Sequence, residues 1–330
     1  MYSRKTVFWA ACLGMLLFGV GLITLGSMAT DLKLKFSLDD EATGALFSVL
    51  PIGILTGSLV FGPVCDRYGY KLILILAGIG MFAGFEGIAW ISSLGILKIS
   101  IFLFGVGAGI INGATNAVVS DVSKGSEGAN LSLLGVFFGI GALGMPSVIG
   151  FLKDDFSSFE IVGAIGWFTL AVSLFYSFIK FPPAKTVGEV QKPNTRKLFQ
   201  QKYLWFLALF LFFHGCLEAI LNNWTTTYLT KHHSISESNA LYALSLYMVG
   251  MSVMRLLIGS VFRSVKLAVL VMVSLVIIVS GILFLHFGNS YTTSVIGLVS
   301  LGIGSAGGFP IILGLAGNRY PSQSGTAFSF

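Results

Sequence analysis

Three polar side chains recur at every fourth position within one long apolar stretch of the chain. His214, Glu218 and Asn222 stand in the run HGCLEAILNNWT, which also holds Asn223 and Trp224. Residues four apart lie on one face of an α-helix, and an ionisable group within a membrane-spanning helix usually faces a cavity or a partner. This spacing predicts a substrate-binding or proton-coupling face, with Glu218 as a proton carrier or hydroxyl acceptor. The alternative is that neighbouring helices satisfy all three groups and the face only holds a bundle together.

A second polar pair, Asn112 and Asn116, lies within another apolar stretch. It accompanies a ladder of small residues, Gly105, Gly109 and Gly113, which allows helices to approach closely. A carboxamide offers both a donor and an acceptor, so two of them facing a cavity suit a polyhydroxylated ligand. A role as contacts between helices explains the pair equally well.

A short basic turn combines glycines, one acid and two cations. It reads GPVCDRYGYK and contains Gly62, Asp66, Arg67, Gly69 and Lys71. Gly62 permits a close helix contact, and Gly69 permits a tight turn with positive φ. The carboxylate of Asp66 can face a helix N-terminus or a basic partner.

The composition requires membrane-spanning helices to position these residues. Of 330 residues, 55% are hydrophobic and only 10% are charged, whereas soluble domains average about 25% charged residues. The net charge of +6 does not indicate nucleic-acid binding, because the cations fall in short segments between apolar runs. We therefore expect a lipid bilayer as the surroundings and no nucleic-acid partner.

Ten apolar runs are long enough to cross a bilayer, which takes about 20 residues each. They cover residues 7–29, 42–64, 72–92, 98–120, 129–151, 159–181, 203–225, 239–262, 267–287 and 291–316. The proline-containing, basic segment 182–202 separates the first six from the last four. We expect an N-terminal six-helix bundle (1–181), a cytoplasmic linker (182–202) and a C-terminal bundle (203–330).

The distribution of Lys and Arg between the loops predicts the orientation. Fourteen lie on the side of the N-terminus and linker, five lie on the other side, and Arg255 lies within a span. By the positive-inside rule, the N-terminus is cytoplasmic and the protein is an integral multi-pass protein of the plasma (inner) membrane. We expect Arg255 to pair inside the bundle or extend to the interface, in a structural role.

Glycines repeat at a constant separation of 197 residues. The matched pairs are Gly53 and Gly250, Gly62 and Gly259, Gly105 and Gly302, Gly107 and Gly304, and Gly128 and Gly325. Parallel repeats of six spans are one transporter plan. The fold expected is an all-α membrane protein of two pseudo-repeated helical bundles with six and four spans, the final two spans being absent.

The turn at Gly62–Lys71 resembles the loop signature of the major facilitator superfamily, in which a glycine precedes D-R-x-G-R/K-R/K. Gly62, Asp66, Arg67, Gly69 and Lys71 match it, while Tyr70 replaces a basic residue. The resemblance implies two bundles that rock about a central site, with this loop as a latch on the inward gate.

The seventh run resembles the fucose-permease-like sugar symporter branch of that family. Gly215, Glu218, Trp224 and Tyr228 stand near the places of its pattern, although the glycine-to-glutamate spacing differs. The acids that this branch carries in spans one and four are absent. The arginine in span four and the G-P pair in span five of drug–proton antiporters are absent as well.

We expect a secondary active transporter rather than an enzyme. Its substrate would be a small polar solute, with a sugar-like one favoured and protons as the possible coupling ion. No residue spacing indicates a catalytic group, a metal site or a cofactor. The alternatives are an exporter of amphipathic compounds and a non-transporting receptor-like or inactive truncated relative.

Overall fold

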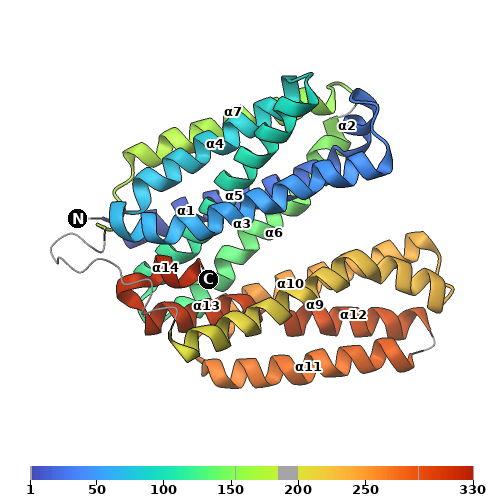
Figure 1. Cartoon of the computed structure of the whole chain (residues 1–330). Helices are drawn as coiled ribbons and strands as arrows, with labels where there is room; N and C mark the ends of the chain where they lie inside the picture. The colour runs from blue at the N-terminus through green and yellow to red at the C-terminus, as the bar shows by residue number, and fades with distance from the viewer. Residues whose placement is uncertain (1, 153, 185–199, 289, 330) are drawn as a thin grey trace. The chain divides into compact units, whose positions relative to one another are not determined.

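The computed structural model describes residues 2–152, 154–184, 200–288 and 290–329, and within these ranges every regular element is a helix (Figure 1). Residues 185–199 of the expected linker lie outside the described residues. The first helices are α1 (Arg4–Ser27), α2 (Ala29–Lys35), α3 (Asp40–Tyr68), α4 (Tyr70–Trp90), α5 (Leu94–Ser123), α6 (Glu127–Leu152) and α7 (Ser158–Phe178). They are followed by α9 (Lys202–His232), α10 (Glu237–Ser260), α11 (Leu267–Phe287), α12 (Tyr291–Ser305), α13 (Gly308–Arg319) and α14 (Ser324–Phe328).

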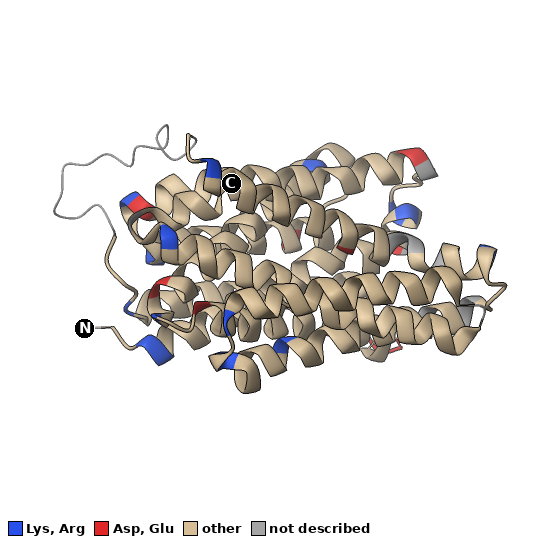
Figure 2. Ribbon diagram, turned by 90° about the horizontal axis from the view of Figure 1, so that it is seen from below, with Lys and Arg blue, Asp and Glu red and all other residues tan. Residues whose placement is uncertain are grey.

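The structure contains the membrane spans that the sequence predicts. Ten helical segments of the described chain are long and apolar enough to cross a bilayer, with α12 and α13 together forming the tenth. Figure 2 shows that most of the charged residues lie at or near helix ends, while the middles of the helices are almost free of them. This arrangement is typical of a multi-pass membrane protein.

One compact unit comprises residues 1–123, 137–198 and 320–330, with α5 as its central helix. α5 packs against α1, α3 and α4, and its glycines explain how. A Cβ atom at Gly109 would lie 2.2 Å from the carbonyl oxygen of Ile54 in α3, and one at Gly113 would overlap the fully buried ring of Phe61. The absence of side chains at these positions lets the helices touch through their backbones.

The second compact unit comprises residues 124–136 and 199–319. Its central helix is α12, which packs against α10 and α11, while α9 contacts α10 and α13. The first turns of α6 belong to this unit. Leu221, Leu229, Tyr247, Leu298 and Leu301 are among the buried residues of its apolar core.

The glycine repeat corresponds to equivalent helix contacts within the two units. A Cβ atom at Gly105 of α5 would lie 2.5 Å from the carbonyl oxygen of Leu50, and one at Gly302 of α12 would lie 2.1 Å from that of Tyr247. Leu50 and Tyr247 are themselves 197 residues apart. α3 therefore contacts α5 as α10 contacts α12.

A second pair of contacts obeys the same shift. A Cβ atom at Gly107 would lie 2.5 Å from the carbonyl oxygen of Ala77 in α4, and one at Gly304 would lie 3.0 Å from that of Ser274 in α11. Ala77 and Ser274 are again separated by 197 residues. These contacts confirm the prediction of two pseudo-repeated helical bundles.

Candidate functional site

The site in the second unit begins at a break in the tenth span. The sequence predicts one uninterrupted run over 291–316, but α12 ends at Ser305 and α13 begins at Gly308. Glycine is a poor helix former, and Gly307 and Gly308 follow one another here. An interrupted helix leaves carbonyl groups without their usual partners, and inside a membrane these need another donor.

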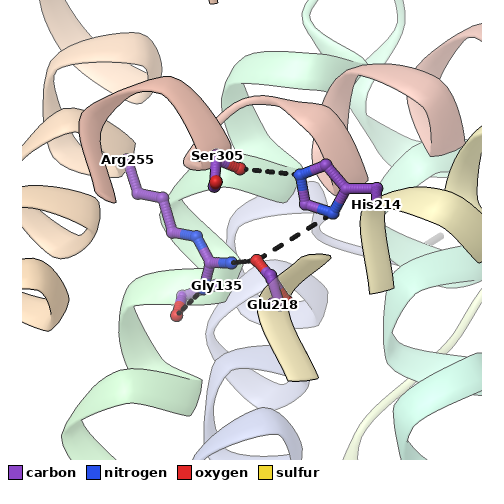
Figure 3. A network of polar contacts seen from close by, with 5 residues as sticks. All are labelled: Gly135, His214, Glu218, Arg255 and Ser305. Carbon is purple, nitrogen blue, oxygen red and sulfur yellow. Dashed lines mark hydrogen bonds and ion pairs between the residues drawn. The ribbon is translucent and has the colours of Figure 1, made fainter. Parts of the chain in front are cut away.

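His214 of α9 bonds to the backbone at this break. Its Nε2 lies 3.0 Å from the carbonyl oxygen of Ser305, and both residues are buried. A Cβ atom at Gly308 would lie 2.2 Å from His214 Nε2, so the imidazole ring packs directly against the backbone of Gly308. The break thus has a specific side chain from another helix that fills and caps it (Figure 3).

Glu218, one turn after His214, forms a loose ion pair with Arg255 of α10. Its Oε1 lies 3.8 Å from Arg255 Nη2 and 4.0 Å from His214 Nδ1. Both distances exceed hydrogen-bond length, and Oε1 is buried with no hydrogen-bond partner in the described part of the chain. Figure 3 shows the three side chains converging from two helices. The geometry therefore holds a charged pair whose hydrogen-bonding capacity is largely unused.

Further polar atoms around this pair are also unsatisfied. Arg255 Nη1 makes a long hydrogen bond of 3.5 Å to the carbonyl oxygen of Gly135 in α6, while its Nε has no partner. The hydroxyl groups of Tyr247 and Ser305 are buried and make no hydrogen bond to any described residue. Tyr247 lies close enough to interact electrostatically with Arg255. Unsatisfied polar atoms in an apolar interior are costly, so their concentration here marks a candidate ligand site.

The structure brings together some of the residues predicted for α9 and not others. His214 and Glu218 lie in one contact network, whereas the Asn222 side chain is exposed. The side chains of Asn223 and Trp224 lie outside the described residues. Arg255 was expected to pair in the bundle or reach the interface, and it pairs with Glu218.

Sequence reasoning missed the contributions of Tyr247 and Ser305. Tyr247 stands in an apolar run like any core aromatic residue, so nothing distinguishes it. Ser305 had a usable signal, because the S-A-G-G run at 305–308 interrupts an otherwise apolar helix with two poor helix formers.

The two asparagines of α5 bond to each other. Asn116 is buried, and its Nδ2 donates to the backbone oxygen of Asn112 at 2.8 Å and to its Oδ1 at 3.1 Å. Asn112 is half-buried. The prediction that both lie on one helix face agrees with this contact, and their role in binding stays a prediction.

The predicted gate loop lies at the end of α3 and holds α14. Gly69 has a φ of +84° and connects α3 to α4. Asp66 is almost fully buried and accepts hydrogen bonds from Gly325 N at 3.2 Å, Thr326 N at 2.8 Å and Thr326 Oγ1 at 2.7 Å. A Cβ atom at Gly62 would lie 2.5 Å from the carbonyl oxygen of Gly325. The acid and the first glycine of the motif thus both contact one turn of α14.

The two cations of the motif do not share that buried position. Arg67 and Lys71 are exposed, and the Arg67 guanidinium lies 5.2 Å from the centre of the Tyr68 ring. A second acid, Asp121 at the end of α5, also contacts α14, since it accepts a hydrogen bond from Ser324 Oγ at 2.8 Å. Sequence reasoning did not single out Asp121; the signal was an acid directly following an apolar run.

Comparison with known proteins identifies a family that shares this architecture. The family model of the Major Facilitator Superfamily matches residues 10–330. The multi-drug resistance efflux pump PmrA of Streptococcus pneumoniae is 31% identical over 172 residues, which cover 51% of this chain and 42% of the pump. The glucose/mannose transporter GlcP of Bacillus subtilis is 24% identical over 316 residues, covering 91% of this chain and 77% of that protein.

The fold is similar to that of a solved symporter. A variant of the E. coli fucose:proton symporter FucP superposes with a TM-score of 0.78 at 18% identity, over 99% of this chain and 88% of that one. The family match extends over nearly the whole sequence, and the helical repeat agrees with it. The chain belongs to the Major Facilitator Superfamily.

Proposed function

We propose that this protein is a secondary active transporter that moves a small polar solute across the membrane by alternating access, with Glu218 as the proton-coupling group. The observation that carries the proposal is the loose pair of Glu218 and Arg255, 3.8 Å apart within two apolar helices. Its family and its fold are those of transporters.

The pair offers a simple route for coupling. Ionised Glu218 attracts Arg255 and holds α9 against α10, because charges interact strongly in a medium of low dielectric constant. Protonation removes this attraction and leaves both groups free to bind a solute. A proton taken up on one side and released on the other would then accompany each solute through the cycle.

A sugar-like solute fits the polar residues and the relatives. Asn112 and Asn116 in the first unit, and separately the exposed Asn222 in the second, carry carboxamide groups of the kind that bind hydroxyl groups well. GlcP is described as a glucose/mannose transporter and FucP as a fucose:proton symporter. Both descriptions support a sugar-like solute and, in the second case, proton coupling.

The contacts of Asp66 support the proposal that the loop 62–71 is a latch. Three hydrogen bonds connect its carboxylate to the first turn of α14. Movement of the loop away from α14 within this unit would break these bonds, so they stabilise the contact of the loop with α14. Their number and their burial favour a role as gate.

A second candidate function is export of an amphipathic compound. It is favoured by the identity of 31% with an efflux pump over about half of this chain. Under this alternative, Glu218 would exchange protons against an outgoing compound, and a gradient directed inward would drive export rather than accumulation.

The test is uptake into proteoliposomes that contain the purified chain. Labelled D-glucose, L-fucose and D-xylose are offered under an inward proton gradient, with external pH varied from 5 to 8. We expect accumulation of at least one sugar that grows as external pH falls, and Glu218→Gln should abolish this dependence on pH. Unchanged pH-dependent accumulation by Glu218→Gln would overturn the coupling role.

A matched control is available in α4. Glu86 is also a half-buried acid within a span, and its Oε1 likewise lacks a hydrogen-bond partner among the described residues, but it lies outside the Arg255 network and its Oε2 accepts a hydrogen bond of 2.9 Å from Trp90 Nε1. Glu86→Gln should therefore keep the pH dependence. Efflux of a fluorescent amphipathic dye, without uptake of any of the sugars, would favour the export alternative.

A further inference from the structure

The guanidinium group of Arg255 has far fewer partners than it can bind. Arginine carries five N–H donors, yet Arg255 makes one long hydrogen bond, from Nη1 to the carbonyl oxygen of Gly135 at 3.5 Å. Its side chain is only 12% exposed. A buried cation with unused donors is costly, so a missing acceptor is expected at this group.

The unused donors lie on one edge of the guanidinium. Nε and Nη2 point their N–H bonds in the same direction, and this edge matches the two oxygens of a carboxylate. Nε has no hydrogen-bond partner among the residues that the structure describes, and Nη2 faces Glu218 Oε1 at the ion-pair distance of 3.8 Å. The edge that suits a carboxylate is therefore not filled by Glu218.

The neighbouring hydroxyl groups add to the excess of donors. Tyr247 and Ser305 are both fully buried, and their hydroxyl oxygens have no hydrogen-bond partner among the described residues. Each hydroxyl can donate one hydrogen bond and accept others. Together with Arg255 they would satisfy a ligand that carries a charged acceptor and further hydroxyl groups.

We propose that the solute is a hydroxylated monocarboxylate and that the Nε–Nη2 edge of Arg255 binds its carboxylate. This inference rests on the proposed transport function and specifies its substrate class. Glu218 is then the internal counterion of Arg255 in the empty site, and the carboxylate of the solute replaces it when Glu218 takes up a proton.

The charge of the site is the same in both states. In the empty site, Arg255 contributes +1 and ionised Glu218 contributes −1. In the loaded site, Arg255 contributes +1, protonated Glu218 contributes nothing, and the solute contributes −1. Because a net charge in an apolar interior is strongly unfavourable, this balance couples one proton to each carboxylate. A neutral sugar would bind more weakly than its acid, because it would leave Arg255 without a counterion after protonation of Glu218.

The titratable and charged groups that face Glu218 come from two helices. These are His214 from α9, together with Arg255 and Tyr247 from α10. From α6 and α12 the network receives the backbone oxygens of Gly135 and Ser305. Protonation of Glu218 removes a competing carboxylate, so the affinity for the solute rises as pH falls.

Matched pairs of solutes test the inference on the unmodified protein. The purified chain in lipid nanodiscs is titrated at pH 6 with labelled D-glucose and D-glucuronate, D-galactose and D-galacturonate, and glycerol and glycerate. Each pair has related hydroxyl groups and differs in one carboxylate. We expect the acid to bind at least about tenfold more tightly in one or more pairs, as the gain of a charged hydrogen-bonded contact predicts. Equal or weaker binding of the acid in every pair, or no binding of any acid, overturns the inference.

Variants then locate the carboxylate. Arg255→Gln should remove the preference for the acid, and Arg255→Lys should restore it only in part, because lysine lacks the two-donor edge. Lys266→Gln, which removes an exposed cation beyond the end of α10, should keep the preference. If the Arg255 variants do not fold, Tyr247→Phe should still weaken binding of the acid several-fold. Retained preference in both Arg255 variants overturns the inference.

Glu218→Gln separates this inference from the transport proposal. Its affinity for the acid should be high and independent of pH between 5 and 8, whereas the unmodified protein should bind more tightly as pH falls. The assay measures binding and needs no transport cycle. Selective binding without uptake would therefore contradict the transport proposal alone, and pH-dependent uptake of neutral sugars without any preference for acids would contradict this inference alone.

Discussion

His214 contributes to the site through both its shape and its hydrogen bond. Its ring packs against Gly308, and its Nε2 bonds to the carbonyl oxygen of Ser305, where the tenth span is interrupted. The same residue lies 4.0 Å from Glu218. A change at the break would therefore affect the orientation of His214 and, through it, the surroundings of Glu218.

Substitution of Gly308 tests this dependence. A Cβ atom at Gly308 would lie 2.2 Å from His214 Nε2, so Gly308→Ala must displace the ring and break its bond to Ser305. We expect a loss of about 1–3 kcal/mol in the free energy of unfolding, measured by thermal unfolding in detergent. The control is Gly215→Ala in α9, where a Cβ atom meets nothing within 4 Å. It should be neutral or slightly stabilising, since alanine favours helices. Equal stability of the two variants would contradict the packing role of Gly308.

The sequence pattern predicted the residues of the site on α9 but did not identify their partners on other helices. His214 and Glu218 were predictable because their spacing of four places them on one helix face. Their partners Arg255 and Ser305 stand 37 and 87 residues after Glu218, in other spans, and no spacing rule connects helices that far apart. Only the packing of α9 against α10 and α13 brings these groups together.

Two helix junctions related by the repeat contain equivalent hydrogen bonds, but the acidic residue stands on opposite partners in the two. Asp121 accepts a hydrogen bond from Ser324 Oγ in one unit, and Glu127 accepts one from Asn318 Nδ2 in the other. The shift of 197 residues converts Asp121 into Asn318 and Glu127 into Ser324. The contact was kept while the acid moved from one partner to the other.

At the position of Asp66, the repeat replaces an acid by a cation. Asp66 corresponds to Arg263 under the shift. Asp66 bonds to the first turn of α14, whereas Arg263 Nη2 donates to Asn130 Oδ1 at 3.0 Å in the first turn of α6. Asp66 makes buried bonds and Arg263 is exposed. The hydrogen bonds at the α3–α14 junction are therefore better shielded from solvent than the one at its counterpart.

Hydrogen exchange measures the strength of the Asp66 junction. Asp66→Asn removes the negative charge and replaces one acceptor oxygen by an amino group. Since hydrogen bonds to charged groups contribute about 1.5–3 kcal/mol, we expect the amides of Gly325 and Thr326 to exchange at least about tenfold faster. Glu41→Gln, which changes an exposed acid near the start of α3, should leave these rates unchanged. Unaltered exchange in Asp66→Asn would show that the carboxylate does not hold α14.

The sequence predicted the membrane-spanning helices more accurately than the break within one of them. Ten apolar runs became ten spans because apolar length alone determines where a chain can cross a bilayer. The break at 306–307 was not predicted: two adjacent glycines weaken the helix there, but the histidine that caps the break comes from another helix. The sequence showed the repeated glycines of these helices, but the central positions of α5 and α12 became evident only from their packing.

At the scale of the whole molecule, the charges are distributed unequally between the two ends of the spans. Fourteen Lys and Arg residues belong to the segments on the side of the N-terminus, and five belong to the other side. One of those five, Lys35, is exposed but bound to its neighbours: its Nζ donates to the carbonyl oxygen of Ala89 at 3.2 Å and lies 4.3 Å from the centre of the Phe159 ring. Partial desolvation lowers the pKa of Lys35.

Cysteine labelling tests the orientation that this imbalance predicts. The native cysteines Cys12, Cys65 and Cys216 are first replaced by serine, and single cysteines are introduced at Ser92, between α4 and α5, or at Ser264, between α10 and α11; both positions are exposed. The positive-inside rule places Ser92 outside and Ser264 in the cytoplasm. An impermeant maleimide should therefore label Ser92→Cys in intact cells, and Ser264→Cys only after the membrane is opened. Labelling of both in opened membranes is the control for reactivity, and the reverse pattern in intact cells would mean that the N-terminus faces outward.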